Sequence, residues 1–148
     1  MFVFDLRGNK VYQPDNGLPG TTTEKEVRDV DDSINLSEKF ALLGRPYEPG
    51  IIGYLNDYKL QIVKVHGPFV WHKHDETDDF FLVVRGRLTI HLRDRDVELQ
   101  EGELFVVPRG VEHCPEADEE AHVLLIEPRG TVNTGDAGGS LTAEPIEL

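Results

Sequence analysis

Apolar residues follow two different patterns along the chain, and the change falls near Asn56. After that residue, short runs of β-favouring side chains alternate with turn residues such as Gly, Asn and Asp. Regular short strands with hairpin spacing predict an all-β domain, either a small barrel or a sandwich. The predicted strands are YKLQIVKV, FVWHKH, FFLVV, RLTIHL, DVELQ, LFVVP and AHVLLIEP.

One short helix is predicted before the strands. Asn35, followed three residues later by Glu38, resembles a capping box that satisfies free backbone N–H groups at a helix start. Leu36, Phe40 and Leu43 then form one apolar stripe along the predicted helix. Gly44 and Pro46 then end the predicted helix.

The two ends of the chain differ in composition from this central region. Residues 1–32 begin with the strand-like FVFDL and continue as a polar, Pro- and Gly-rich arm without sustained periodicity. Residues 133–148 are rich in Gly, Thr and acidic residues, which indicates a flexible tail or a strand that folds against another subunit. We expect one globular domain, a barrel over residues 33–132, with an extended arm at each end.

Charge and hydropathy exclude several classes of partner. The 148 residues carry 28 acidic and 15 basic side chains, a formal net charge of −13, so nucleic acid and anionic membranes are not expected partners. No apolar run approaches the roughly 20 residues of a membrane span, and the start MFVFDLRGNK lacks the pattern of a signal peptide. We therefore expect a cytoplasmic protein, and the single cysteine, which cannot form an internal disulfide, agrees with a reducing compartment without proving one.

Three histidines and a carboxylate form the candidate site. His72 and His74 are two residues apart, so their imidazoles project from the same face of an extended strand. Asp79 precedes the apolar run 80–84, and His113 comes from a distant predicted strand. Imidazoles with one carboxylate favour a divalent transition metal (Fe, Mn, Ni, Co, Cu or Zn) over calcium, which prefers oxygen ligands.

The spacing of these residues resembles the two motifs of the cupin family. The first motif, G(x)5HxH(x)3,4E(x)6G, is matched by His72, His74 and Gly86, with Asp79 in the glutamate position. The residues that match the second motif, G(x)5PxG(x)2H, are Gly102, Pro108, Gly110 and His113. Fifteen residues separate the motifs, the short spacing of small, single-domain bacterial-type cupins.

The first motif departs from the family pattern in two places. Four residues lie between Gly67 and His72, where the pattern has five. Asp79 is one methylene shorter than the glutamate, so it must sit closer to the metal, bind through water, or yield its place to Asp78 or Glu76. The identity of the carboxylate ligand therefore stays open at this point.

The resemblance implies a double-stranded β-helix, the cupin jelly roll, of the type often described as mannose-6-phosphate-isomerase-like. It implies one divalent metal on His72, His74, Asp79 and His113, together with a small-molecule ligand or substrate. Cupins commonly pair through their outer sheet face, so a homodimer is expected. In that dimer Phe80 and Leu82 would lie on the shared face, and the N-terminal arm or the tail after position 132 would contribute.

Strand alternation predicts which side chains surround the metal. Phe81 and Val83 share the face of Asp79, whereas Trp71 and Cys114 adjoin ligands but point away and pack elsewhere. Further cavity residues are expected from the next strand, at Leu88, Ile90 and Leu92 or their alternates. The histidines not expected to act as ligands are His66, His91 and His122.

Cupins carry out many reactions, so the resemblance does not decide the function. The leading interpretation is a small metal-dependent enzyme whose ion polarises two oxygens of a substrate, with isomerase, dioxygenase and decarboxylase chemistry all open. The alternative is a non-catalytic binding or sensing module whose metal holds a small ligand. A third interpretation is a metal-stabilised barrel without a ligand.

Overall fold

The computed structural model describes residues 2–4, 10–12 and 32–148. The chain separates into two units, residues 1–32 and residues 33–148. In the first unit, strands β1 (Phe2–Phe4) and β2 (Lys10–Tyr12) pair antiparallel. The remainder of the predicted N-terminal arm lies outside the described residues.

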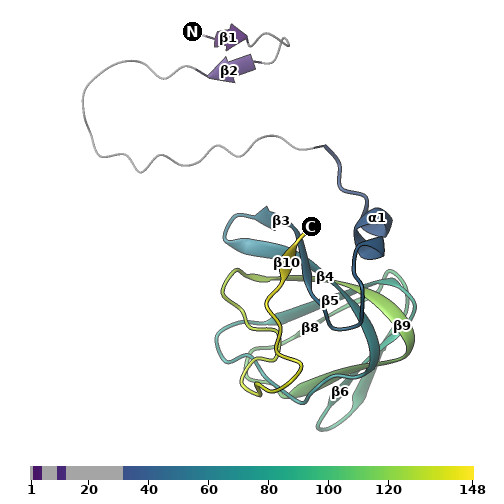
Figure 1. The fold of residues 1–148 in the computed structure, drawn as a ribbon. Coiled ribbons are helices and arrows are strands. Elements are labelled where there is room, and N and C mark those ends of the chain that lie inside the picture. The colour runs from purple at the N-terminus through teal and green to yellow at the C-terminus, as the bar shows by residue number, and fades with distance from the viewer. Residues whose placement is uncertain (1, 5–9, 13–31) are drawn as a thin grey trace. The chain divides into compact units, whose positions relative to one another are not determined.

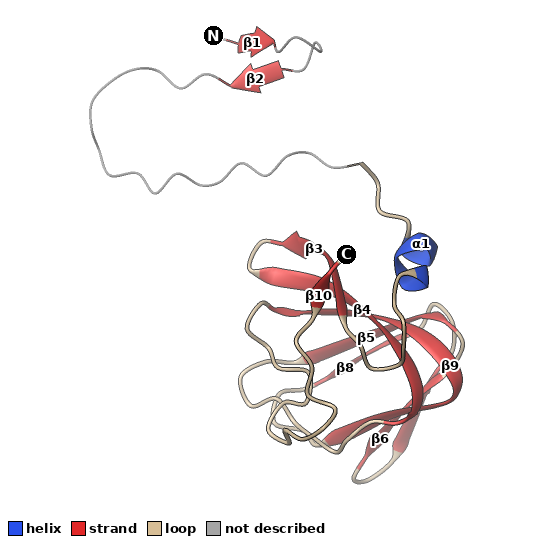
Figure 2. Cartoon of the chain, in the orientation of Figure 1, coloured by secondary structure: helices blue, strands red, loops and turns tan. Residues whose placement is uncertain are grey.

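Residues 33–148 form a barrel of strands with one short helix on its outside (Figures 1 and 2). The sheet order is β10-β3-β4-β9-β5-β8, and β6 pairs with both β7 and β9. The predicted all-β jelly roll with a short helix is confirmed. Its elements are α1 (Leu36–Ala41), β3 (Gly50–Leu55), β4 (Tyr58–Pro68), β5 (Asp79–Arg85), β6 (Leu88–Leu92), β7 (Asp96–Leu99), β8 (Leu104–Val107), β9 (His113–Pro128) and β10 (Ile146–Glu147).

Helix α1 begins as its sequence predicts and packs against the sheet. The Asn35 side chain accepts a hydrogen bond of 3.1 Å from the backbone N–H of Glu38 and so caps the helix start. Phe40 and Leu43 are buried with Ile62 of β4 in one apolar cluster. Phe40 also stacks on His122 of β9, with ring centroids 4.3 Å apart. The helix therefore covers the outer side of the β4–β9 pair.

Strand β9 joins the parts of the barrel. One edge pairs with β4 from Pro128 back to Glu116, while the other edge pairs with β6 near its start and with β5 near its end. A register shift between Val65 and Gly67 bends the β4–β9 ladder. Gly86 fits against this bend with φ of 84°, and a Cβ there would lie 3.1 Å from the Glu120 carbonyl oxygen.

The structure differs from the sequence prediction at several strand boundaries. Strand β3 was not predicted, because Gly50 and Gly53 interrupt its apolar run. The predicted strand FVWHKH is not a regular strand, since β4 ends at Pro68 and only His72 forms a further β-bridge. Strand β9 begins at His113, well before the predicted AHVLLIEP.

The C-terminal segment lies against the barrel of its own chain. Strand β10 pairs parallel with β3, with Ile146 opposite Gly50. Thr134 is fully buried, and its hydroxyl lies 2.6 Å from that of Thr142. The sequence had left this segment as a flexible tail or an intersubunit strand, because few of its side chains are apolar.

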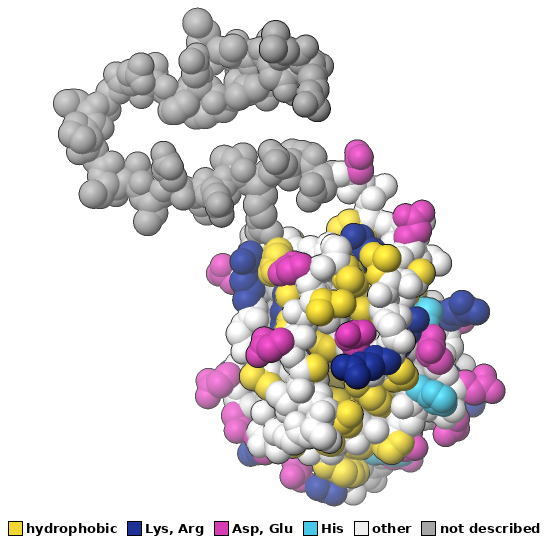
Figure 3. All heavy atoms as spheres, viewed as in Figure 1, with side chains coloured by type: hydrophobic (Ala, Val, Ile, Leu, Met, Phe, Trp, Pro, Cys, Tyr) yellow, Lys and Arg dark blue, Asp and Glu magenta, His cyan; other side chains and the backbone are white. Residues whose placement is uncertain are grey.

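The surface agrees with the acidic composition. On the face seen in Figure 3, acidic side chains are spread around the barrel between basic and apolar ones. In the part of the chain that the structure describes, no helix is long and apolar enough to cross a membrane.

The packing of α1 leads to a first prediction. Replacing Phe40 with alanine is expected to lower the free energy of unfolding by about 3–5 kcal/mol, because it opens a cavity between the helix and the sheet. Leu42 of the same turn is 60% exposed, and Leu42→Ala should cost less than about 0.5 kcal/mol. Urea unfolding measures both variants, and equal losses would contradict the described packing.

Candidate metal centre

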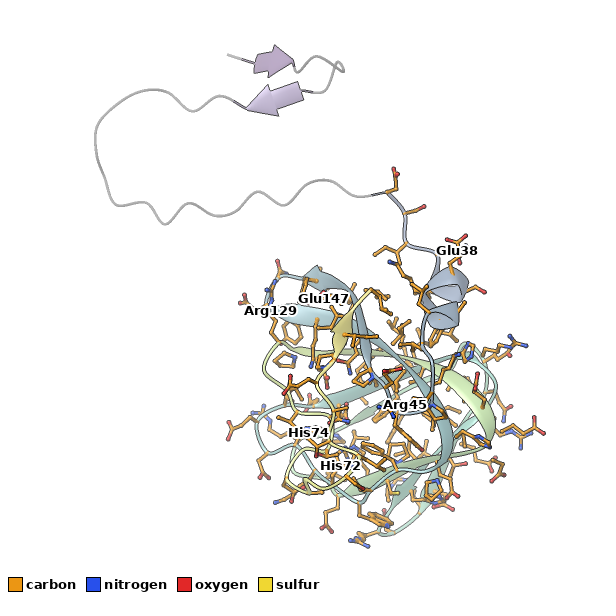
Figure 4. The ribbon with its side chains drawn as sticks, in the orientation of Figure 1. Glu38, Arg45, His72, His74, Arg129 and Glu147 are labelled. Atoms are coloured by element: carbon orange, nitrogen blue, oxygen red, sulfur yellow. The ribbon has the colours of Figure 1, made fainter. Side chains whose placement is uncertain are left out.

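The four candidate residues meet inside the barrel, although they come from three separate segments. His72 lies in the extended segment after β4 and exchanges two backbone hydrogen bonds with His113, of 3.0 and 2.9 Å. Asp79 is the first residue of β5, and His113 is the first residue of β9. All four side chains are buried, with their ligand atoms within 4.8 Å of one another. Figure 4 shows His72 and His74 within the barrel.

The histidine Nε2 atoms converge on one carboxylate oxygen. Asp79 Oδ2 lies 2.9 Å from Nε2 of His113, 3.3 Å from Nε2 of His74 and 4.0 Å from Nε2 of His72. Two ligands of one ion with bonds of about 2.1 Å lie at most about 4.2 Å apart. The donor atoms are therefore close to the spacing that a single metal ion needs, with little movement of the side chains.

Backbone carbonyls fix the tautomers of two of the histidines. The Nδ1–H of His72 donates to the Val70 carbonyl at 2.8 Å, and that of His113 donates to the Val111 carbonyl at 2.9 Å. In the neutral rings, the Nε2 atoms then carry lone pairs that face the Asp79 carboxylate. Lone pairs and a carboxylate repel one another unless a positive charge, either a proton or a metal ion, lies among them.

Electrostatics favour the metal-binding protonation states of His72 and Asp79. Burial and the neighbouring His113 lower the pKa of His72 to about 4, so its ring is neutral at pH 7. Burial alone would raise the pKa of Asp79, but hydrogen bonds from His113 and His74 lower it to about 2. Burial also lowers the pKa of His74, and the Asp79 contact more than offsets that effect, so the net shift is upward.

The structure places Asp79, rather than its neighbours, next to the histidines. Asp78 instead accepts a hydrogen bond of 2.9 Å from the backbone N–H of Arg109 and is exposed. Glu76 is exposed, whereas Asp79 is buried. Asp79 begins a strand whose alternate residues face the barrel interior. Asp79 is therefore the carboxylate that the fold brings to the cluster.

The C-terminal segment supports the histidine segment from outside. Asp136 Oδ1 accepts a hydrogen bond of 2.9 Å from the backbone N–H of Lys73, the residue between the two histidines. The backbone N–H of Asp136 donates to the Lys73 carbonyl at 3.2 Å. Gly135 has a φ of 52°, and a Cβ there would lie 2.2 Å from that carbonyl oxygen. The contact therefore needs glycine at position 135, and sequence motifs gave no sign of it.

A cavity of about 50 Å³ adjoins the candidate ligands. As predicted, Phe81 lines it. Val83 and the predicted residues of β6 (Leu88, Ile90 and Leu92) instead belong to the main apolar core, because the cavity opens toward β4 and β9. Its lining is Tyr47, Pro49, Gln61, Val63, Val65, Phe69, His72, His74, Asp79, Phe81, Pro115, Val123, Leu125, Glu127 and Asn133.

Sequence reasoning missed two polar residues of this lining, Gln61 and Glu127. Burial raises the pKa of Glu127 to about 7, with a further contribution from the negative charge of Asp79. Strand alternation could have identified Gln61 from the sequence, because Gln61 shares a strand face with Val63 and Val65. A polar residue on the inner face of a barrel strand is a candidate for binding.

The remaining predicted residues lie away from the cluster. His91 contacts Asp96 and Glu116, each at 2.7 Å, and His122 stacks on Phe40. Cys114 is buried as expected. Trp71, which was expected to pack against a second sheet, is instead 38% exposed, and the Arg93 guanidinium lies 3.8 Å from its ring centroid.

Comparisons with known proteins agree with this fold. Residues 59–127 match the Cupin domain family. The chain is 48% identical to a cupin-2 domain containing protein from Shewanella frigidimarina, whose crystal structure aligns with a TM-score of 0.64. That alignment covers 65% of this chain and 94% of the Shewanella chain.

Other similar proteins are dioxygenases. The 3-hydroxyanthranilate 3,4-dioxygenase of Ruegeria pomeroyi is 30% identical over 88 residues, which are 55% of this chain and 49% of that enzyme. The crystal structure of hydroquinone 1,2-dioxygenase from Sphingomonas sp. TTNP3 aligns with a TM-score of 0.60 over 82% of this chain and 85% of its own. At 18% identity, this second likeness concerns the fold alone. The chain spans between 27% and 56% of the length of the curated relatives it matches.

The contact at Gly135 leads to a second prediction. In Gly135→Ala the new methyl group is expected to displace the Lys73 carbonyl and with it the two flanking histidines, so affinity for Zn²⁺ or Co²⁺ should fall by roughly 10-fold or more. Gly138 is a matched control, because its φ is also positive, at 62°, and nothing lies within 4 Å of its Cβ position. Competition with a chromogenic chelator measures both affinities. Equal affinities in the two variants would contradict a supporting role for the C-terminal segment.

Proposed function

Because the chain belongs to the cupin superfamily and gathers three histidines and an aspartate inside its barrel, we propose that it is a small metal-dependent enzyme. The proposed ligands are His72, His74, Asp79 and His113. The substrate is a small oxygen-bearing molecule, and dioxygenase chemistry is the best supported of the open reaction classes.

One observation carries the metal proposal. Nε2 atoms of rings held in the Nδ1–H tautomer face a buried carboxylate, and this donor set needs a shared positive charge. Three imidazole nitrogens and one carboxylate oxygen suit divalent iron, manganese, cobalt, nickel, copper or zinc. When bound, such an ion acts as a Lewis acid toward substrate oxygens, and a five- or six-coordinate ion keeps positions open beyond four protein ligands.

The residues of the chain supply the surroundings that such chemistry needs. Val63, Val65 and Val123 form an apolar part of the cavity wall beside the polar candidate ligands. Tyr47 and Phe69 stack with ring centroids 4.8 Å apart beside it, and Phe69 meets His72 edge to face. These contacts hold the segment that carries His72 in one orientation. They also leave room for only a small molecule in the cavity.

Dioxygenase chemistry is favoured over isomerase and decarboxylase chemistry by the similar enzymes. The 3-hydroxyanthranilate 3,4-dioxygenase of Ruegeria pomeroyi, which is named for a hydroxylated aromatic substrate, is 30% identical over 55% of this chain. The alternative function is a binding or sensing module that holds a small ligand on its metal without converting it. Turnover separates the two, because a sensor binds its ligand and consumes no dioxygen.

The experiment that tests the proposal begins with elemental analysis of protein purified without added metal. That metal is then restored, and dioxygen consumption is followed with a panel of small diols, hydroxyketones and dihydroxybenzenes. Dioxygen uptake with one of these compounds, abolished by a chelator, is the expected result. Ligand binding without turnover of any kind would favour the sensor instead.

Two neighbouring carboxylates provide a matched pair of variants and a third prediction. Asp79→Asn should lower metal affinity by about 10-fold or more, by removing a coordinating charge. Asp78→Asn makes the same chemical change one residue away, on a side chain that contacts Arg109, and should leave the affinity unchanged. Damage by Asp78→Asn alone would refute the ligand assignment, as would full metal content in a His72→Ala, His113→Ala double variant.

We also propose that the protein is a homodimer. Strand β8 is an edge of the described sheet, and Leu104 and Val106 on it are 56% and 41% exposed. Edge strands with exposed apolar side chains are sites of pairing. Phe80 and Leu82 of the adjacent β5 extend this apolar surface.

The fourth prediction concerns this edge. Sedimentation equilibrium is expected to give a dimer for the full chain and a monomer for Val106→Lys, because a charge at the centre of an apolar contact must be desolvated. Leu55→Lys is the control, since Leu55 is also an exposed apolar residue, at 55%, but lies in the β3–β4 hairpin. A monomeric full chain would contradict the dimer. A chain lacking residues 1–30 shows by the same measurement whether the N-terminal arm contributes.

A further inference from the structure

A buried polar cluster lies at the opposite end of the β4–β9 ladder from His113. Lys59, Gln61 and Glu127 are only 3%, 1% and 3% exposed. Lys59 Nζ lies 3.2 Å from Glu127 Oε1 and donates to the Thr131 carbonyl at 2.9 Å. Gln61 Nε2 donates to the same Glu127 oxygen at 3.3 Å. Gln61 and Glu127 line the cavity that also holds His74 and Asp79.

The carboxylate of Glu127 fixes the orientation of the Gln61 amide. Because a carboxylate oxygen accepts hydrogen bonds, the amide nitrogen turns toward Glu127 and the amide oxygen turns away. Gln61 Oε1 is left without a hydrogen-bond partner, and among the described residues it is the one buried side-chain nitrogen or oxygen in that state. A buried acceptor without a donor is costly, so in a cavity wall it is a position where a donor binds, either a water molecule or a ligand hydroxyl that replaces it.

The rest of the cavity restricts what that ligand can be. None of the lining residues is lysine or arginine, so a second anionic group on a ligand would find no cationic partner beyond the metal. Lys59 is already engaged by Glu127 and Thr131. An uncharged ligand fits these limits better than an acid.

We propose that Gln61 is a specificity-determining residue whose amide oxygen accepts a hydrogen bond from a hydroxyl group of a short, neutral hydroxycarbonyl substrate. Glu127 is the positioning residue that orients the amide, and Lys59 holds Glu127 in place. The inference rests on the proposed function, because the carbonyl end of the substrate binds at the metal. A neutral substrate would distinguish this chain from 3-hydroxyanthranilate 3,4-dioxygenase, whose named substrate is an acid.

Two probes that differ by one hydroxyl group test the proposal. Dihydroxyacetone and hydroxyacetone offer the same carbonyl and one hydroxyl, and only dihydroxyacetone has a second hydroxyl for Gln61. Isothermal titration calorimetry on the metal-loaded full chain is expected to show dihydroxyacetone binding at least 5-fold more tightly. Gln61→Met keeps the length of the side chain and should reduce that ratio to near one, with hydroxyacetone affinity unchanged.

Two further variants keep the outcome clear. Glu127→Gln presents a donor to the Gln61 amide, which can then turn its oxygen away from the cavity, so the ratio should fall there as well. Gln100→Met makes the same change as Gln61→Met at an exposed position and should behave as the unaltered protein. Circular dichroism melting establishes that each variant is folded.

The outcomes separate the inference from the proposed function. A 5-fold preference that survives both Gln61→Met and Glu127→Gln would overturn the inference, and so would failure of the metal-loaded protein to bind either probe. Metal content, measured on the same samples, reports on the proposed function alone. A chain that takes up no stoichiometric metal would overturn the proposed function, whatever the probes show.

Discussion

The antiparallel pairing of β4 with β9 sets the geometry of everything functional in this barrel. The ladder runs from Tyr58 opposite Pro128 to Pro68 opposite Glu116, so the two strands form a long, bent two-stranded platform. At one end, β9 begins with His113 and its backbone hydrogen bonds to His72. At the other end lies the buried pair of Lys59 and Glu127, which are opposite each other in the ladder. Because backbone hydrogen bonds fix the register, the separation between the two ends of the cavity is fixed too.

Charge within the cavity explains why a cation suits the site so well. Asp79 and Glu127 bring two carboxylates into a buried space, and their mutual repulsion contributes to the raised pKa of Glu127. Lys59 compensates one of these charges. Buried charges without partners are unfavourable, so the second carboxylate needs either protonated imidazoles or an ion. A polar interior of this kind stabilises the fold less than an apolar core would, and it suits the binding of a ligand.

Much of the centre was predictable because its signals are local in sequence. His72 and His74, two residues apart, and the spacing of glycines and a proline before His113 depend on short-range chain geometry, and Asn35 identified the helix start in the same way. The carboxylate stayed ambiguous, because Asp78 and Asp79 are adjacent in sequence, and the pairing of β5 with β8, which begins at Asp79, decides which of them faces the interior. Alternation also failed where the chain leaves regular pairing, as it does around Trp71.

The parts of the candidate site that could not be predicted from the sequence are contacts between segments far apart in the chain. Gln61 meets Glu127 across 66 residues, and neither side chain is unusual within its own strand. The Lys73 backbone meets Asp136 across 63 residues, at a turn that carries no motif. That second contact has a consequence for biogenesis. Proteins emerge from the ribosome N-terminal end first, so the histidines leave it well before the segment that supports them. The histidine cluster can reach its final geometry only after the segment that supports it has been made. Loading of the proposed metal would then follow completion of the barrel rather than the appearance of its ligands.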